Sequence, residues 1–306
     1  MIFRPAAAVP AFACALMVTA PAVGHAEPPV AGRYVAMGSS YAAGPGIEPV
    51  QGAGCARSDR NYAHQVADAT GFTLTDVTCS GATTANLLSE PRQISGGGTA
   101  APQIDAVTED TGLVTITIGG NDLGLIGGML ASSCGSIAGR ALPAAPPDEV
   151  TGQLNTLCGR AATTEPSSAD IERVTQALTD IVRAVQDKAP GATVLLVEYL
   201  PVLAPAAHTC PEAPLAPEDA TATRRTYDAL IAATRRAAAD TGVDSLAVPG
   251  ADTHTACSPG PWVNGLIAPA PGAALPDLMS AVGSSYHPNL AGMSAVAQQV
   301  TAAVRR

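Results

Sequence analysis

Residues 113–122 read LVTITIGGND. The first six are rich in β-branched residues, which suit the pleated surface of a sheet. The two glycines that follow allow a tight turn and a close approach of the backbone to a ligand. This stretch therefore predicts a buried strand that ends before Gly119, with Asn121 just beyond its carboxyl end.

The rest of the chain alternates between strand and helix patterns. Short apolar or alternating runs predict four more strands, at residues 34–37, 72–77, 194–199 and 243–248. Apolar residues at helical spacing predict long helices at 171–185, 220–241 and 290–304. Ser167 and Asp170 have the spacing of a capping box before the first of these helices. Strands that alternate with helices form a parallel sheet covered on both faces, so the predicted fold class is α/β.

The N-terminal residues have the composition of a secretory signal peptide. Arg4 gives a positive start, residues 6–22 are almost wholly apolar, and residues 24–26 form a small-x-small cleavage site. We therefore expect residues 1–26 to be removed and residues 27–306 to form a single secreted domain. No later stretch has the ~20 uninterrupted apolar residues that a membrane span needs, so no transmembrane segment is predicted.

The net charge and the cysteines limit the kinds of function that the chain can have. The formal net charge is −10, which disfavours nucleic-acid binding. An even number of cysteines after the signal peptide predicts disulfides, although many pairings are open in principle. We expect sequential pairing, as Cys55–Cys79, Cys134–Cys158 and Cys210–Cys257. None of these cysteines belongs to a CxxC or HxxxH cluster, so neither a metal nor another cofactor is expected.

Four short segments lie where predicted elements meet. Ser40, in GSSYAAG, follows the first predicted strand, and Gly81, in CSGATT, follows the second. Asn121 follows the central stretch quoted above, and His287, in SSYHPN, precedes the final helix. Each residue alone is also typical of a helix cap or a turn. Together, a serine, a histidine and amide donors at the carboxyl edge of a sheet are the groups that acyl transfer needs.

These four segments, in this order and spacing, resemble the four sequence blocks of SGNH (GDSL-type) hydrolases. The chain is most similar to the secreted, three-disulfide lipase/esterase branch, and the resemblance extends over about residues 33–303. It implies a flavodoxin-like three-layer α/β/α sandwich with a mainly parallel five-stranded sheet, and an enzyme that hydrolyses carboxylic esters. Carried over residue by residue, it makes Ser40 the nucleophile and His287 the base. The oxyanion hole would consist of the Ser40 N–H, the Gly81 N–H and the Asn121 side chain.

Two positions depart from the family pattern. Ser39 replaces the aspartate of the first block, and Ser284 stands where the acid of the catalytic triad is expected. A triad acid holds the histidine in the required tautomer, and a main-chain carbonyl that accepts from Nδ1–H can do the same. We therefore expect the carbonyl of Ser284 to orient His287, with Asp277 as the alternative orienting group.

Two other functions remain open on the same scaffold. A carbohydrate O-deacetylase would be expected to carry aromatic platforms for sugars, and Trp262 alone is available. A domain that has lost its acid could instead bind a cell-wall ligand without catalysis, but the retention of Ser40, His287 and the oxyanion positions argues against decay. We expect a small-molecule or lipid ester as substrate, no nucleic-acid partner, and a monomer.

Overall fold

The structure is a computed structural model that describes residues 1–2, 32–51, 54–133, 164–267 and 274–305. The predicted signal peptide and its boundary after residue 26 fall outside these residues, apart from Met1 and Ile2, and remain predictions. Among the helices in the described part of the chain, none is long and apolar enough to cross a bilayer.

A five-stranded parallel sheet forms the centre of the fold, as predicted. The strands, in their order across the sheet, are β4 (Thr73–Asp76), β1 (Arg33–Gly38), β7 (Thr111–Thr117), β8 (Thr193–Val197) and β9 (Asp244–Leu246). The central strand β7 contains most of the LVTITI stretch, and all but one of its residues are buried. This burial follows from the helices that cover both faces of a parallel sheet.

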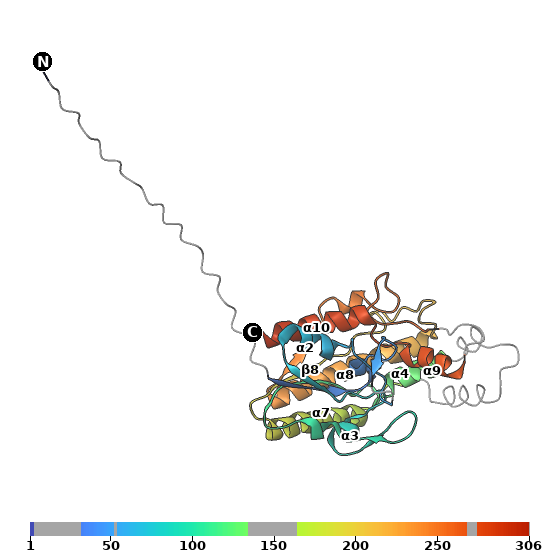
Figure 1. Cartoon of the computed structure of the whole chain (residues 1–306). Helices are drawn as coiled ribbons and strands as arrows, with labels where there is room; N and C mark the ends of the chain where they lie inside the picture. Colours follow the sequence, from blue (N-terminus) through green and yellow to red (C-terminus); the bar gives the residue numbers. More distant parts are fainter. Residues whose placement is uncertain (3–31, 52–53, 134–163, 268–273, 306) are drawn as a thin grey trace.

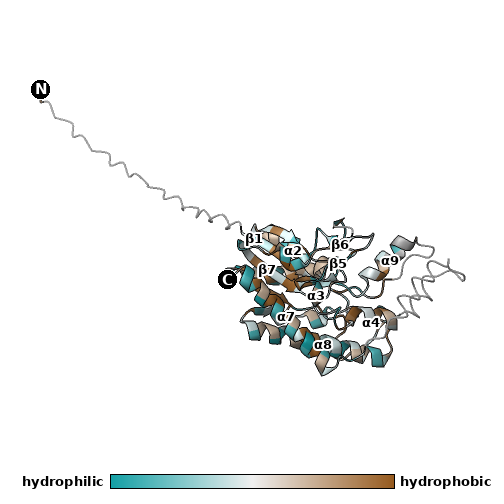
Figure 2. Ribbon diagram, turned by 90° about the horizontal axis from the view of Figure 1, so that it is seen from below, coloured by the Kyte–Doolittle hydropathy of each residue, from teal (hydrophilic) through white to brown (hydrophobic). Residues whose placement is uncertain are grey.

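Helices form a layer on each face of the sheet (Figure 1). On one face, α2 (Tyr62–Thr70) packs against α10 (Leu290–Val304). On the other face, α3 (Thr84–Leu88) and α8 (Pro217–Thr241) each pack against α7 (Ser168–Lys188). The three-layer α/β/α sandwich is therefore confirmed. Figure 2 shows hydrophobic residues concentrated in β1 and β7, and hydrophilic residues on α7 and α8.

The longer helix α8 begins three residues before the predicted start, and α7 begins at the predicted cap. Ser167 and Asp170 form the predicted capping box of α7, in which each side chain accepts from the backbone N–H of the other residue. α8 begins at Pro217, whose missing N–H would have no partner in the first turn of a helix. Each helix runs back across a parallel sheet, so its N-terminal end lies near the carboxyl ends of the strands and its C-terminal end near the opposite edge.

Two short hairpins outside the central sheet were not predicted. They are β2–β3 (Val50–Gln51 with Arg57–Ser58) and β5–β6 (Arg92–Gln93 with Thr99–Ala100). The Ser95 N–H donates to the Gly54 carbonyl at 3.2 Å and joins the two hairpins. The remaining short elements are α1 (Ser40–Ala43), α4 (Leu125–Ser132), α9 (Leu275–Ser284) and the 3₁₀ helices η1 (Gln103–Ala106) and η2 (Ala251–Thr253).

Two of the three predicted disulfides, Cys55–Cys79 and Cys210–Cys257, are confirmed. Cys134 and Cys158 lie outside the described residues. The Cys55–Cys79 bond joins the β2–β3 hairpin to the segment that follows β4 and carries Gly81. Such a bond typically contributes ~3 kcal/mol by restricting the unfolded chain.

Candidate active site

Ser40 lies at the carboxyl end of β1, as the first residue of the short helix α1. The preceding strand ends at Gly38, which has φ 151°, and a Cβ there would lie 2.5 Å from the Thr117 carbonyl oxygen. Glycine is therefore required for this approach of β1 to β7. The side-chain amide of Gln103 accepts from the Gly38 N–H at 2.7 Å and donates to the Gly38 carbonyl at 3.0 Å. These contacts fix the backbone that presents Ser40.

His287 lies beside Ser40, although the two residues are 247 positions apart in the sequence. Its Nε2 is 2.7 Å from Ser40 Oγ, and its Nδ1 is 2.8 Å from the carbonyl oxygen of Ser285. Because a carbonyl can only accept, Nδ1 carries the hydrogen of the neutral ring, and Nε2 presents its lone pair to the Ser40 hydroxyl. Both side chains are buried. A histidine in this arrangement can take a proton from the serine.

The surroundings of His287 keep its ring neutral. Burial lowers the pKa of His287 to about 4, because the charged ring would lose its hydration. The hydrogen bond to the Ser285 carbonyl acts in the opposite direction and offsets only part of this shift. The ring of Tyr41 lies beside the imidazole, with ring centroids 5.5 Å apart. The His287 ring is therefore neutral at pH 7.

The carbonyl that accepts from His287 Nδ1 is that of Ser285 and not that of Ser284, which was predicted from the sequence. Ser284 is the last residue of α9, and its carbonyl accepts from the Asn264 side chain at 3.1 Å and from the His287 backbone N–H at 3.4 Å. Ser285 leaves the helix with an extended backbone (φ −62°, ψ 139°), which turns its carbonyl toward the imidazole. The prediction assumed the three-residue spacing of a side-chain acid, whereas a carbonyl two residues back reaches Nδ1.

Asp277, the alternative orienting group, lies in the first turn of α9 and is exposed. At a rise of ~1.5 Å per residue, it lies roughly 10 Å along the helix axis from Ser284. Both residues line a cavity of about 490 Å³ that includes neither Ser40 nor His287 in its wall. The structure therefore does not bring Asp277 to the imidazole.

Gly81 and Asn121 lie on adjoining loops, beyond β4 and β7 respectively. Gly81 has φ 78°, a conformation that glycine adopts without strain. One N–H of the Asn121 amide donates to the Ala82 carbonyl at 2.8 Å. The Asp122 carboxylate forms a second link, because it accepts from the Thr84 N–H at 3.1 Å and from the Thr84 hydroxyl at 2.6 Å. The two loops are thus held together, and the second N–H of the Asn121 amide remains for a ligand.

Tyr199, just beyond β8, connects the Ser40 turn to the Asn121 loop. Its hydroxyl accepts from the Gly120 N–H at 3.3 Å and lies 2.7 Å from Ser39 Oγ. Burial raises the pKa of Tyr199 above its usual range, so the hydroxyl keeps its hydrogen and can donate to Ser39. Tyr41 stacks on the Tyr199 ring, with centroids 4.2 Å apart. Ser39, which departs from the family aspartate, therefore belongs to a buried network that supports the site.

Sequence reasoning missed the supporting residues Gln103, Asp122 and Tyr199. Asp122 and Tyr199 had a weak signal, because Asp122 closely follows one predicted strand and Tyr199 is the last residue of another, where the site was expected. Gln103 had no such signal, since it acts from the 3₁₀ helix η1, 65 positions away from Gly38.

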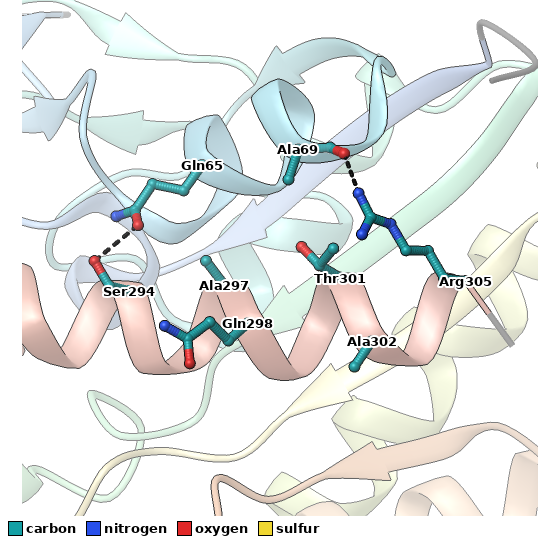
Figure 3. A pocket seen from close by; sticks show the side chains of 8 residues that line it. All are labelled: Gln65, Ala69, Ser294, Ala297, Gln298, Thr301, Ala302 and Arg305. Carbon is teal, nitrogen blue, oxygen red and sulfur yellow. Dashed lines mark hydrogen bonds between the residues drawn. The ribbon is translucent and has the colours of Figure 1, made fainter. Parts of the chain in front are cut away.

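A second cavity, of about 470 Å³, lies between α2 and α10 (Figure 3). Ser294 and Gln65 face each other across it at 2.8 Å, and Arg305 donates to the Ala69 carbonyl. This cavity contains none of the site residues named above. Within the part of the chain that the structure describes, no group of three His, Cys, Asp or Glu side chains is placed to hold a metal ion.

Known proteins with the same fold identify the class of enzyme. The crystal structure of a phospholipase A1 from Streptomyces albidoflavus is 25% identical, with a TM-score of 0.63, and that of an extracellular lipase from Streptomyces rimosus is 26% identical, with a TM-score of 0.61. Each alignment covers 90% of this chain and 100% of the solved chain. This chain, like them, is a carboxylic ester hydrolase.

The family is equally clear. Residues 36–295 match the GDSL-like Lipase/Acylhydrolase family, so the chain belongs to this family. Lipase 2 of Streptomyces coelicolor is 36% identical over 270 residues, which cover 80% of this chain and 81% of that protein. The resemblance drawn from the four sequence segments is therefore confirmed, and the chain is a lipase or esterase of this family.

Proposed function

We propose that this chain is a secreted lipase or esterase in which Ser40 attacks the ester carbonyl and His287 acts as the base. The observation that carries the proposal is the 2.7 Å contact between Ser40 Oγ and His287 Nε2, in a ring whose Nδ1–H is bonded to the Ser285 carbonyl. As Oγ attacks, its proton passes to Nε2, and the alcohol then leaves with that proton. Water next attacks the acyl-enzyme, gives a proton to Nε2, and releases the carboxylic acid while Ser40 regains its hydrogen.

The tetrahedral intermediates carry a negative charge that needs N–H donors. We assign this role to the Ser40 N–H, the Gly81 N–H and the Asn121 side chain. Asn121 suits the role because one N–H of its amide anchors it to Ala82 and leaves the other to donate. Loss of one such donor typically costs ~3–4 kcal/mol of transition-state stabilisation.

The Ser285 carbonyl performs part of the function that the acid has in a catalytic triad. It fixes the tautomer of His287 through Nδ1–H, and its dipole stabilises the imidazolium that forms during attack. Because a carbonyl is a dipole without a net charge, this stabilisation is weaker than that from a carboxylate. We therefore propose a Ser40–His287 dyad with main-chain orientation.

Lipid esters are the substrate class that we propose, since the related proteins are a phospholipase A1 and lipases. Export through residues 1–26 is part of the proposal, and one relative is an extracellular lipase. A carbohydrate deacetylase is less well supported, because His254 stacks on Trp262 with centroids 4.0 Å apart and covers one face of the indole. The monomeric state stays a prediction.

A series of p-nitrophenyl esters of increasing acyl length tests this proposal. We expect the wild-type protein to hydrolyse the series with a preference for particular chain lengths, and a serine-directed phosphonate to label Ser40, as located by peptide mass spectrometry. A folded protein that neither hydrolyses any ester nor acquires the label would support the alternative function, a domain that binds a ligand without catalysis.

The pH dependence of kcat/KM follows from the low pKa of His287. Protonated His287 cannot accept the Ser40 proton, so activity should be present above the pKa and fall as the pH drops through about 4. If the imidazole had its ordinary pKa, kcat/KM would instead fall as the pH drops through ~6.5. The measurement is a pH profile with a soluble ester, with circular dichroism at each pH as the control for folding. An acidic limb near the ordinary value would show that the ring is hydrated or paired with a carboxylate.

The same shift has a consequence for stability. The folded pKa of His287 lies below that of an unfolded histidine, so unfolding takes up a proton between about pH 6.5 and the folded pKa of about 4. The contribution of His287 to stability is therefore fully present above the unfolded pKa and is lost as the pH falls toward 4.

A further inference from the structure

Arg92, on the β5–β6 hairpin, packs directly against Gly81. A Cβ at Gly81 would lie 2.2 Å from the Nη2 atom of Arg92, so the guanidinium occupies the space beside the glycine. The same Nη2 donates a long hydrogen bond, 3.4 Å, to the Ser80 carbonyl. A partly buried positive charge therefore lies beside the loop to which we assign an oxyanion donor.

The charge of Arg92 is not balanced within the described part of the protein. None of the ion pairs found there includes Arg92, and its Nε is buried without a hydrogen-bond acceptor. The neighbouring Ser80 Oγ is likewise buried and without a partner. The chain carries 26 acidic residues against 16 Lys and Arg, so carboxylates are not scarce. Buried polar and charged groups are normally paired, and two exceptions in one place indicate a function.

A second arginine, on the β2–β3 hairpin, donates a hydrogen bond to the loop that carries Gly81. Arg57, in β3, is partly buried and donates to the Thr78 carbonyl at 3.1 Å. None of the ion pairs in the described residues includes Arg57 either. The carbonyls that the two arginines contact belong to residues 78 and 80, three positions and one position before Gly81. Two positive charges thus contact the same loop, in a protein whose net charge is −10.

We propose that Arg92, supported by the charge of Arg57, binds a phosphate group on the alcohol part of the ester substrate. The inference rests on the proposed function, because it places the scissile carbonyl at Ser40 and beside Gly81. Guanidinium groups donate in a planar fork that matches phosphate oxygens, and two positive charges suit a group that carries up to two negative ones. A carboxylate in the acyl chain carries a single negative charge and would need only one positive charge beside it. Arg92 is then a specificity residue that favours phosphate-bearing esters over neutral ones.

Two esters that differ only in the phosphate test the inference. We would measure kcat/KM for 1-octanoylglycerol 3-phosphate and for 1-octanoylglycerol below the concentration at which either forms micelles, by octanoate release. The proteins are the wild type, Arg92→Ala, Arg92→Lys and Arg183→Ala. Arg183 is a matched control because it is an exposed arginine near the C-terminal end of α7, at the opposite edge of the sheet.

The ratio of kcat/KM for the phosphate ester to that for the neutral ester is the decisive quantity. We expect the wild type to favour the phosphate ester and Arg92→Ala to lower the ratio roughly 10- to 100-fold, the effect of one hydrogen-bonded charge. Arg92→Lys should retain part of the preference, and Arg183→Ala all of it. Raising the salt concentration should also reduce the preference of the wild type.

The wild-type protein supplies a measurement that does not depend on the folding of any variant. Glycerol 3-phosphate should inhibit the hydrolysis of 1-octanoylglycerol competitively, whereas glycerol at the same concentration should not.

Equal hydrolysis of both esters by the wild type, or an equal loss of kcat/KM on both esters in Arg92→Ala, would overturn the inference about Arg92 alone. A folded wild type that hydrolyses neither ester would count against the proposed function itself. A preference for a p-nitrophenyl ester with a carboxylate in its acyl chain, without one for the phosphate ester, would reassign the anion to the acyl side and overturn the inference.

Discussion

Replacement of Ser40 by alanine is expected to lower kcat by ~10⁴- to 10⁶-fold while the protein stays folded. Alanine has no hydroxyl, so no acyl-enzyme can form. The substitution removes only the hydrogen bond to His287, which keeps its bond to the Ser285 carbonyl, so the loss of stability should be about 1 kcal/mol. Steady-state kinetics with a soluble p-nitrophenyl ester, together with thermal unfolding, measure both effects.

Ser39→Ala is the matched control for this experiment. Ser39 is adjacent to Ser40 and also buried, but its hydroxyl contacts Tyr199 and not His287. We expect a loss of kcat of roughly 5-fold, which corresponds to the ~1 kcal/mol of one buried hydrogen bond that supports the turn. If Ser40→Ala kept more than a few per cent of the activity, or if both substitutions had the same effect, Ser40 would not be the nucleophile.

Replacement of His287 by alanine should lower kcat by a similar factor, ~10⁴- to 10⁶-fold, because Ser40 then has no base to take its proton. The two residues act as one unit, so the double variant Ser40→Ala/His287→Ala should be no less active than either single variant. The pair of single variants and the double variant, measured under the same conditions, check this. A further loss in the double variant would show that Ser40 and His287 act independently.

Asp277→Ala distinguishes main-chain orientation of His287 from orientation by a carboxylate. Asp277 is exposed at the far end of α9 from Ser284, so its removal should leave kcat close to that of the wild type. A loss on the order of 100-fold, in a variant with an unchanged unfolding temperature, would contradict the Ser285 assignment and would restore a side-chain acid to the mechanism.

The central sheet and the places of the site residues could be predicted because they depend on local patterns. The β-branched run of β7 and the capping box of α7 appear directly in the sequence, and both were confirmed. Ser40 and Asn121 follow strands whose carboxyl ends meet at one edge of a parallel sheet, so neighbouring strands place them at the same edge. Contacts that follow from topology in this way need no knowledge of side-chain packing.

The parts that could not be predicted depend on exact backbone direction or on very short elements. The choice between the carbonyls of Ser284 and Ser285 is decided by where α9 ends, and helix ends are the least certain feature of a sequence-based prediction. The hairpins that carry Arg57 and Arg92 have strands of two residues, too short for any alternation to show. The contact of Gln103 with Gly38 joins residues without a shared pattern.

In the proposed mechanism, orientation of His287 by a main-chain carbonyl makes this part of the site resistant to point mutation. Every amino acid supplies a main-chain carbonyl, so no single substitution at position 285 can delete the group, as the substitution of an aspartate would. Only a change that redirects the backbone at the end of α9 would remove it. An inventory of side chains alone would therefore miss the third group of the proposed machinery, because the identity of no residue encodes it.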